Sequence, residues 1–342
     1  MNFKSDNTSG VSPEILQAIT EINTGFSASY GTDDVSKKLK ARVAEIFECD
    51  VEIYMTSTGT ASNNLALSAL VSPYGSIFCH KKGHINTDEC GGTELFTGSA
   101  KVIPIGGDGA KIDLHELEQY ILAANAMRPH ASKPSVINIS QVTEYGTVYT
   151  LDELAAIGAL AQKYSLGFHM DGARFTNALV ALGCSPAAMT WKRGVDILSF
   201  GATKNGALMS EMVVIFNKKY AQDFDYRHKR VGQLMSKTRF FAVQFLAYLD
   251  NDLWLRNARH ANAMAAKLVT ELSEYKNTKI MYNVQANEIF ATMSSDLVKF
   301  LWDNHAHFYH WEDDVYRLVT SWVTTEQEIN DFIELLKKFY TK

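Results

Sequence analysis

Short apolar runs alternate with amphipathic, helix-spaced stretches along the chain as far as about residue 249. The stretch at residues 151–164, for example, repeats its apolar side chains at helical spacing and separates two such runs. Alternation of this kind is typical of an α/β protein, and it predicts a mostly parallel central sheet with helices on both faces. The predicted strands occupy residues 51–55, 76–79, 102–105, 136–139, 166–170, 197–200 and 212–216.

The pattern changes after about Leu249. A long helical stretch is followed by short strand-like runs near residues 279–281, 288–293 and 316–321, and by a final helix from Thr325. This order indicates a separate α+β unit. We therefore expect a large domain over residues 1–249, including the N-terminal segment, and a smaller one over residues 250–342.

The first helix is predicted to begin at Ser12 and Pro13. A serine hydroxyl can cap the first turn, and proline is favoured at the first helical position because its missing N–H costs nothing there.

Composition narrows the classes of partner and compartment. A net charge of −5 and a pI near 6.1 provide no basic surface for nucleic acid. No run reaches the roughly 18 apolar residues of a membrane-spanning helix, and Met1 is not followed by the apolar stretch of a secretory signal. The four cysteines are scattered, which is typical of a reducing compartment. We expect a cytoplasmic protein with no nucleic-acid or membrane partner.

Lys204 stands among small residues directly after the apolar run at residues 197–200. A lysine that is partly desolvated loses proton affinity and becomes a nucleophilic amine, the form that reacts with an aldehyde cofactor. An ordinary solvent-exposed loop lysine explains this segment alone equally well.

Asp171 ends another apolar run, at the edge where open α/β sheets bind their ligands. A carboxylate there can keep a pyridinium nitrogen protonated and maintain the ring as an electron sink. Arg174 follows at a distance that would let it bind a substrate carboxylate through two hydrogen bonds. The alternative is a structural Asp–Arg pair, and only the presence of Lys204 favours the catalytic interpretation.

Thr58, Gly59 and Thr60 follow the first predicted strand and open an apolar helix. Small residues at a helix N-terminus allow backbone amides to approach a phosphate group. The cluster is a weak signal by itself, because such residues also cap helices. Neither the Gly-x-Gly-x-x-Gly pattern of dinucleotide sites nor the phosphate-loop pattern of nucleotide triphosphatases is present.

With these motifs in order, the chain resembles the low-specificity L-threonine aldolases over nearly its full length. These enzymes are members of fold type I of the pyridoxal 5′-phosphate enzymes, whose architecture is that of aspartate aminotransferase. The matching stretches are Ser5-Asp6-Asn7, Tyr30-Gly31, Thr58-Gly59-Thr60, His84 with Asp88-Glu89, residues 146–149, residues 169–174, residues 201–206 and residues 317–322.

The resemblance implies a role for each matching residue. Lys204 would hold pyridoxal 5′-phosphate covalently, Asp171 would hold its ring nitrogen, and His84 would stack on the ring near the substrate hydroxyl. Family members are commonly homotetramers with active sites shared between subunits. The remaining implied roles are phosphate binding by Thr58, Gly59 and Thr60, carboxylate binding by Ser5, Arg174 and Arg317 with Arg174 also near the cofactor, and a contribution across the subunit interface by Tyr30.

Two departures from the family pattern affect the substrate side of the site. Glu144 occupies the region where several relatives have a second histidine, and it is expected to handle a proton or position a water beside the substrate. The stretch at residues 230–235 lacks the triple glycine of other branches.

The expected reaction is cleavage of L-threonine or L-allo-threonine to glycine and acetaldehyde, with His84 or a water that it orients as the base for the hydroxyl. The same catalytic groups also serve a β-eliminating lyase, a phenylserine aldolase or an aminotransferase. A non-catalytic binding protein would not need Lys204, Asp171 and both arginines.

A metal site is not expected. His80 and His84 are four residues apart, with Cys79 and Cys90 near them, but the spacing is not a standard zinc pattern. His80 and His169 are interpreted as structural histidines.

Overall fold

The computed structural model describes residues 1–275 and 278–341. Its main sheet has seven strands in the order β1-β7-β6-β5-β4-β2-β3. Each of the seven apolar runs predicted as a strand falls on one of them. They are β1 (Glu52–Thr56), β2 (Gly75–His80), β3 (Lys101–Ile105), β4 (Lys133–Ser140), β5 (Gly167–Gly172), β6 (Ile197–Gly201) and β7 (Glu211–Ile215).

Strand direction in this sheet follows the length of the connections. From β6 to β3 the neighbouring strands pair in parallel. Only the short segment 202–210 joins β6 to β7, which leaves no room for a crossover helix, so β7 returns antiparallel to both β6 and β1. The predicted mostly parallel sheet is confirmed.

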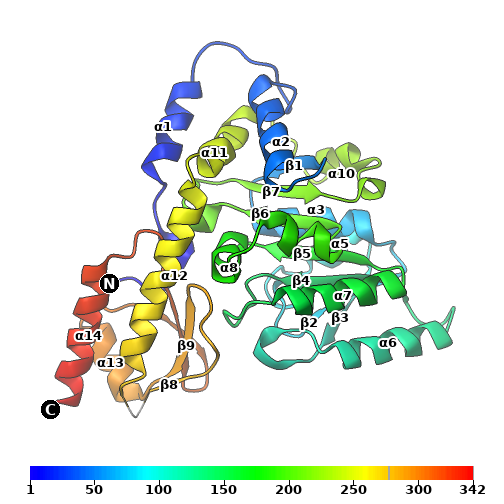
Figure 1. Cartoon of the computed structure of the whole chain (residues 1–342). Helices are drawn as coiled ribbons and strands as arrows, with labels where there is room; N and C mark the ends of the chain where they lie inside the picture. The colour runs from blue at the N-terminus through cyan, green and yellow to red at the C-terminus, as the bar shows by residue number, and fades with distance from the viewer. Residues whose placement is uncertain (276–277, 342) are drawn as a thin grey trace.

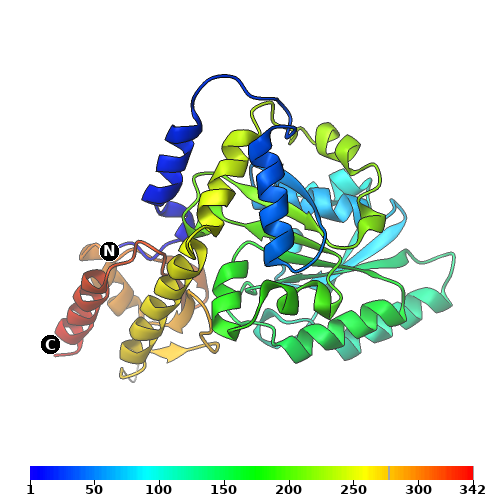
Figure 2. The same ribbon diagram turned by 45° about the horizontal axis from the view of Figure 1, so that its top comes forward.

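Helices cover both faces of the sheet, as Figures 1 and 2 show. Along β6, Ile197 belongs to the same apolar cluster as Leu65 of α3, whereas Leu198 packs in the cluster that contains Leu154 of α7. Successive residues therefore bury their side chains on opposite faces, which is why the strands are almost continuously apolar.

The helices and 3-10 turns of this larger unit connect and flank the strands. They are η1 (Asp6–Thr8), α1 (Pro13–Ile22), α2 (Asp34–Ile46), α3 (Gly59–Leu70), α4 (His84–Thr87), α5 (Gly92–Thr97), η2 (Asp108–Ala110), α6 (Leu114–Ala126), α7 (Leu151–Lys163), α8 (Phe175–Leu182), α9 (Pro186–Met189), η3 (Trp191–Arg193), η4 (Thr203–Asn205), η5 (Lys218–Tyr220), α10 (Phe224–Arg230) and α11 (Arg239–Leu249).

The start of α1 differs in one detail from the prediction. The helix begins at Pro13, but the hydroxyl of Ser12 does not cap it. Ser12 is buried, and its Oγ accepts a hydrogen bond from Nδ2 of Asn257 at 3.0 Å. The hydroxyl thus ties α1 to the long helix α12 (Leu253–Leu272) instead of satisfying the first helical turn.

A second, four-stranded sheet lies beside α12 and has the order β10-β11-β9-β8, with every pair antiparallel (Figure 1). The sequence patterns predicted three of its strands and the last helix. They missed the edge strand β10 and the helix α13. The elements are β8 (Lys279–Ile280), β9 (Glu288–Thr292), α13 (Ser295–Asp303), β10 (Tyr309–Glu312), β11 (Val315–Val319) and α14 (Glu326–Tyr340).

The N-terminal segment packs into this second unit. Phe3 is fully buried in the apolar cluster that includes Leu268, Leu318 and Phe332. Its backbone N–H donates to the carbonyl of His307, and its carbonyl accepts from the N–H of Val319. The N-terminal segment thus completes the core of the second unit. The predicted large domain, residues 1–249, includes this segment, although its Phe3 packs into the smaller unit.

Replacing Phe3 by alanine is expected to lower the free energy of unfolding by about 3–5 kcal/mol, because the side chain leaves a cavity in a closed core. Urea unfolding followed by tryptophan fluorescence measures the change. Leu16→Ala serves as the control, since Leu16 is 53% exposed. An effect of Phe3→Ala no larger than that of Leu16→Ala would contradict the packing described.

Among the residues that the structure describes, no helix combines the length and the apolar character needed to cross a membrane.

Candidate active site

One cavity, with a volume of about 250 Å³, lies where the carboxyl ends of β5 and β6 meet the loop after β1. This is the edge at which parallel sheets of α/β proteins bind ligands. Six of the residues predicted for the site lie together in its wall. The lining residues are Asn7, Ser57, Thr58, Gly59, Thr60, Asn63, His84, Asp171, Ala173, Thr203, Lys204 and Glu211.

Lys204 lies in the turn η4, immediately after β6. The turn ends at Gly206, whose φ of 115° is a conformation that favours glycine, and a Cβ there would lie 2.2 Å from Oγ of Ser12. Desolvation lowers the pKa of the Lys204 amine, and the charge of Arg174 lowers it further while Asp6 opposes the change. The turn therefore presents a lysine with an enlarged neutral, nucleophilic fraction.

Asp171 is connected to His84 through a chain of hydrogen bonds. Nδ2 of Asn63 donates to Oδ2 of Asp171 and to Oε1 of Glu89, in each case at 2.8 Å. The same Oε1 of Glu89 lies 2.9 Å from Nδ1 of His84. The backbone N–H of Ala173 donates to the other oxygen of Asp171 at 3.0 Å. Both oxygens of Asp171 are thereby fixed at the end of β5.

His84 is held from two sides. The hydrogen bond that the imidazole donates to Glu89 raises the pKa of His84, and burial opposes that rise. Its backbone N–H donates to Oε1 of Glu144 at 2.8 Å, and the same oxygen accepts from Oγ of Ser140 at 2.5 Å. Glu144 thus positions the start of α4 through the backbone of His84.

Burial raises the pKa of Glu144 to about 7, against the hydrogen bonds from Ser140 and His84. A carboxyl that titrates near neutrality can hold or release a proton under physiological conditions. The structure places Glu144 against the backbone of His84 and not in the wall of the cavity, and its expected role in handling a proton or positioning a water stays a prediction.

Thr58 caps α3, and its hydroxyl accepts from the N–H of Ala61 at 3.1 Å. The preceding Ser57 is bonded through its N–H and its hydroxyl to Oε1 of Gln233, at 2.9 and 3.1 Å. Gln233 therefore fixes the loop from a distant part of the chain, and no local sequence pattern predicted this contact. Gly59 and Thr60 complete a helix N-terminus that opens on the cavity.

The two arginines predicted to bind the substrate carboxylate lie close to each other but already have acidic partners. Arg174 donates through Nε and Nη2 to the two carboxylate oxygens of Asp6, at 2.7 and 3.0 Å, and its Nη1 lies 3.1 Å from Glu288. Nη1 of Arg317 lies 3.8 Å from the other oxygen of Glu288. Arg174 therefore forms the structural ion pair that was the alternative interpretation, and its binding of a substrate carboxylate stays a prediction.

Arg317 also retains bonding capacity. Its Nε is buried and has no hydrogen-bond partner, and its guanidinium lies over the rings of Tyr309 and Trp311 at 5.7 and 5.2 Å from their centres. Ser5 lies at the start of η1, where its Oγ accepts from the N–H of Asn7. One N-terminal turn, residues 5–7, therefore lies between the arginines and the cavity.

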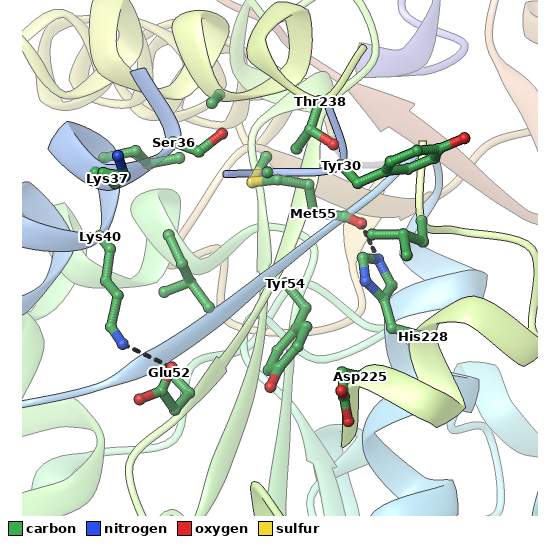
Figure 3. A pocket seen from close by; sticks show the side chains of 15 residues that line it. Tyr30, Ser36, Lys37, Lys40, Glu52, Tyr54, Met55, Asp225, His228 and Thr238 are labelled. Atoms are coloured by element: carbon green, nitrogen blue, oxygen red, sulfur yellow. Dashed lines mark hydrogen bonds and ion pairs between the residues drawn. The ribbon is translucent and has the colours of Figure 1, made fainter. Parts of the chain in front are cut away.

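Tyr30 lies away from this cavity. It is 48% exposed and lines a separate pocket of about 340 Å³ between α2, β1 and α10, shown in Figure 3. The ammonium group of Lys229 lies 5.2 Å from the centre of its ring. Within a single copy of the chain the structure does not bring Tyr30 to the other predicted residues.

The two histidines interpreted as structural are both engaged by hydrogen bonds. His169 is fully buried, with Nδ1 2.6 Å from Asn138 and Nε2 3.0 Å from Ser199, and burial lowers its pKa to about 4. His80 accepts at Nδ1 from the N–H of Lys82 and contacts the carbonyl of Gly107 through Nε2. Neither ring has a nitrogen directed to the cavity.

Comparison with known proteins identifies the family. A family model described as beta-eliminating lyase matches residues 2–296. The low specificity L-threonine aldolase of Pseudomonas sp. (strain NCIMB 10558) is 39% identical over 96% of this chain and 95% of its own length. The chain belongs to the threonine aldolase family. A second low specificity L-threonine aldolase, from Pseudomonas aeruginosa, matches with the same identity and coverage.

Solved structures agree with this placement. A threonine aldolase of Leishmania major has a TM-score of 0.92 at 28% identity, covering 98% of each chain. An aspartate aminotransferase of Thermotoga maritima, at 12% identity and a TM-score of 0.74, covers all of this chain and 92% of its own, and shows the shared fold alone. The predicted aspartate-aminotransferase-like architecture and the predicted family are both confirmed.

Proposed function

We propose that this chain is a pyridoxal 5′-phosphate-dependent aldolase that cleaves L-threonine and L-allo-threonine to glycine and acetaldehyde. One observation supports the proposal most strongly. A desolvated lysine, a fixed carboxylate and a helix N-terminus line one small cavity in a member of the threonine aldolase family.

The residues of the cavity fit that cofactor. Lys204 offers an amine with a lowered pKa for covalent attachment, and Asp171 offers a carboxylate for a ring nitrogen. Thr58, Gly59 and Thr60 form the N-terminus of α3, where backbone amides and the helix dipole favour a phosphate group. When bound, pyridoxal 5′-phosphate supplies an electron sink for the pair of electrons left at the substrate α-carbon.

His84 is assigned as the base for the substrate hydroxyl. With its Nδ1–H donated to Glu89, the tautomer leaves Nε2 free to accept the hydroxyl proton. As that proton leaves, the Cα–Cβ bond breaks, the aldehyde departs and the α-carbon takes up a proton to give glycine. Glu144 supports this step by holding the backbone of His84 in place.

The substrate carboxylate is assigned to Arg317, Arg174 and Ser5. Arg317 has a buried N–H donor without an acceptor, and Arg174 lies on the other side of Glu288. Two guanidinium groups at this edge favour an α-amino acid over an amine without a carboxylate. We further propose a cytoplasmic homotetramer in which Tyr30 contributes to the site of a neighbouring subunit.

The family model described as beta-eliminating lyase supports a second candidate reaction. Loss of a leaving group from the β-carbon would use the same Lys204 and Asp171, but it would yield a keto acid and ammonia in place of glycine and an aldehyde. The products therefore discriminate between the two reactions.

The test begins with the visible spectrum of the purified protein before and after borohydride. L-threonine and L-allo-threonine are then added, and aldehyde and glycine are measured. A yellow protein that becomes labelled on Lys204 and releases acetaldehyde is expected. A yellow protein that releases a keto acid would replace the aldolase with a lyase, and a colourless protein that cannot be reconstituted would overturn the cofactor as well.

Replacing Glu89 by glutamine should lower the pKa of His84, because the neutral amide still accepts from Nδ1 but no longer stabilises the imidazolium. If neutral His84 is the base, the acidic limb of kcat/KM moves to lower pH. NMR titration of the imidazole and the pH profile measure both changes. Glu89→Ala removes the hydrogen bond as well, so a profile unchanged in both variants would exclude His84 as the titrating base.

A further inference from the structure

Glu211 is a buried carboxyl in the cavity wall that the proposed reaction does not use. It is the first residue of β7 and is 7% exposed. Val213 and Ile215, which point the same way along the strand, belong to the apolar cluster of α3. Glu211 therefore directs its side chain to the face of the sheet covered by α3.

Its neighbours in the sheet place it under the N-terminus of that helix. Glu211 pairs in register with Thr56 of β1 on one side and Gly201 of β6 on the other. Thr56 leads directly into the loop that caps α3, and its hydroxyl bonds to Ser62 in the first turns of the helix at 2.5 Å. The carboxyl thus lies between the Lys204 turn and the proposed phosphate site.

Gly201 leaves room both for the backbone of Ala173, whose Cα and O would lie 2.8 Å from a Cβ there, and for this carboxyl. Oε2 of Glu211 lies 3.0 Å from the point where a Cβ of residue 201 would be, and Oε1 accepts from the N–H of Thr203 at 3.4 Å. The missing side chain at Gly201 and the backbone N–H of Thr203 together position the carboxyl of Glu211.

The charges around Glu211 do not balance a carboxylate and a phosphate at once. Lys204 is the cation that acts on it and Asp171 is a second anion, while burial, and with it the charge of Glu211, raises the pKa of Tyr248 in α11. The helix α3 carries no charged side chain. Burial raises the pKa of Glu211 to about 7, and Lys204 and the Thr203 hydrogen bond oppose that rise. A phosphate monoester arriving at α3 adds further negative charge and raises the cost of ionising the carboxyl.

We propose that Glu211 keeps its proton when a phosphate monoester binds at the N-terminus of α3 and donates its O–H to that phosphate. Binding of a phosphorylated cofactor is therefore coupled to uptake of a proton by this carboxyl. The inference rests on the proposed cofactor. It adds that Glu211 recognises the phosphate group only while its own carboxyl is protonated.

The experiment measures proton uptake by calorimetry at pH 8 in buffers with different heats of ionisation. Pyridoxamine 5′-phosphate is the probe, because it has no aldehyde to react with Lys204. The wild type is expected to take up about one proton more than Glu211→Gln, and its affinity should fall up to about tenfold per pH unit above neutrality. The glutamine variant keeps a donor and should lose that part of the pH dependence.

Asp196→Asn is the matched control. Asp196 is a partly buried carboxyl just before β6, at the opposite edge of the sheet, and its oxygens bind Asn217 and Phe168. This variant should keep the proton uptake of the wild type. Equal proton uptake by the wild type and Glu211→Gln would overturn the proposal, and so would an unchanged pH dependence of affinity.

A second measurement uses the wild type alone, in case Glu211→Gln does not fold. The infrared difference spectrum on adding the probe at pH 8 should gain the carbonyl band of a protonated carboxylic acid. Its absence would overturn the proposal. If the probe binds to none of the proteins, the proposed cofactor itself is wrong, which distinguishes that failure from binding without proton uptake.

Discussion

Lys204→Ala is expected to lower kcat/KM for L-threonine by about four orders of magnitude, or about 5.5 kcal/mol of transition-state stabilisation. The alanine leaves the carboxylate of Asp171 and the helix N-terminus in place, so the cofactor can still enter the cavity without covalent attachment. Substrate exchange then loses its internal amine, and product release becomes slow.

Two readouts test the assignment of this loss to Lys204. Borohydride treatment followed by peptide mass analysis should label the peptide that contains Lys204 in the wild type and leave the variant unlabelled. Lys219→Ala, an exposed lysine after β7, is the control and should retain full activity. Aldehyde release by Lys204→Ala at the wild-type rate would remove Lys204 from the mechanism.

Asp171→Asn is expected to lower kcat by about a thousandfold, the usual cost of removing a preorganised charge from an enclosed site. The asparagine has nearly the same shape, but it no longer keeps a ring nitrogen protonated. Its amide also meets two donors, Nδ2 of Asn63 and the N–H of Ala173, so one of the present hydrogen bonds is lost.

The measurement compares turnover, the visible spectrum and thermal unfolding of Asp171→Asn with those of the wild type. A spectrum shifted away from the protonated form, with the folded structure retained, would assign the loss to the charge. The same loss of turnover in a variant that no longer binds the cofactor would assign it to binding, and near-normal turnover would eliminate this role for Asp171.

Six residues predicted from the sequence line one cavity because each lies at the end of an apolar strand or in the segment that follows it. Lys204 comes just after β6, Asp171 lies at the end of β5, and Thr58 follows β1. In a parallel sheet the carboxyl ends of the strands share one edge, so local patterns were sufficient to bring these residues together. The alternation of apolar runs with helix-spaced stretches predicted the seven strands themselves.

The outer part of the site could not be predicted in this way. Asp6 and Glu288 reach Arg174 from an N-terminal turn and from the second sheet, and no local spacing links such distant positions. Glu211 begins a strand that is otherwise apolar, and no local motif singled it out. The strand at residues 309–312 was missed because it is short, lies at an edge and is largely exposed.

The placement of Phe3 has a consequence for the order in which the molecule assembles. Phe3 belongs to a core whose other members, such as Leu318 and Phe332, lie very far from it along the chain. Contacts between such distant positions close a long loop, which is entropically costly and slow. The parallel sheet pairs strands that are much closer in sequence, so we expect it to form before the second core is complete.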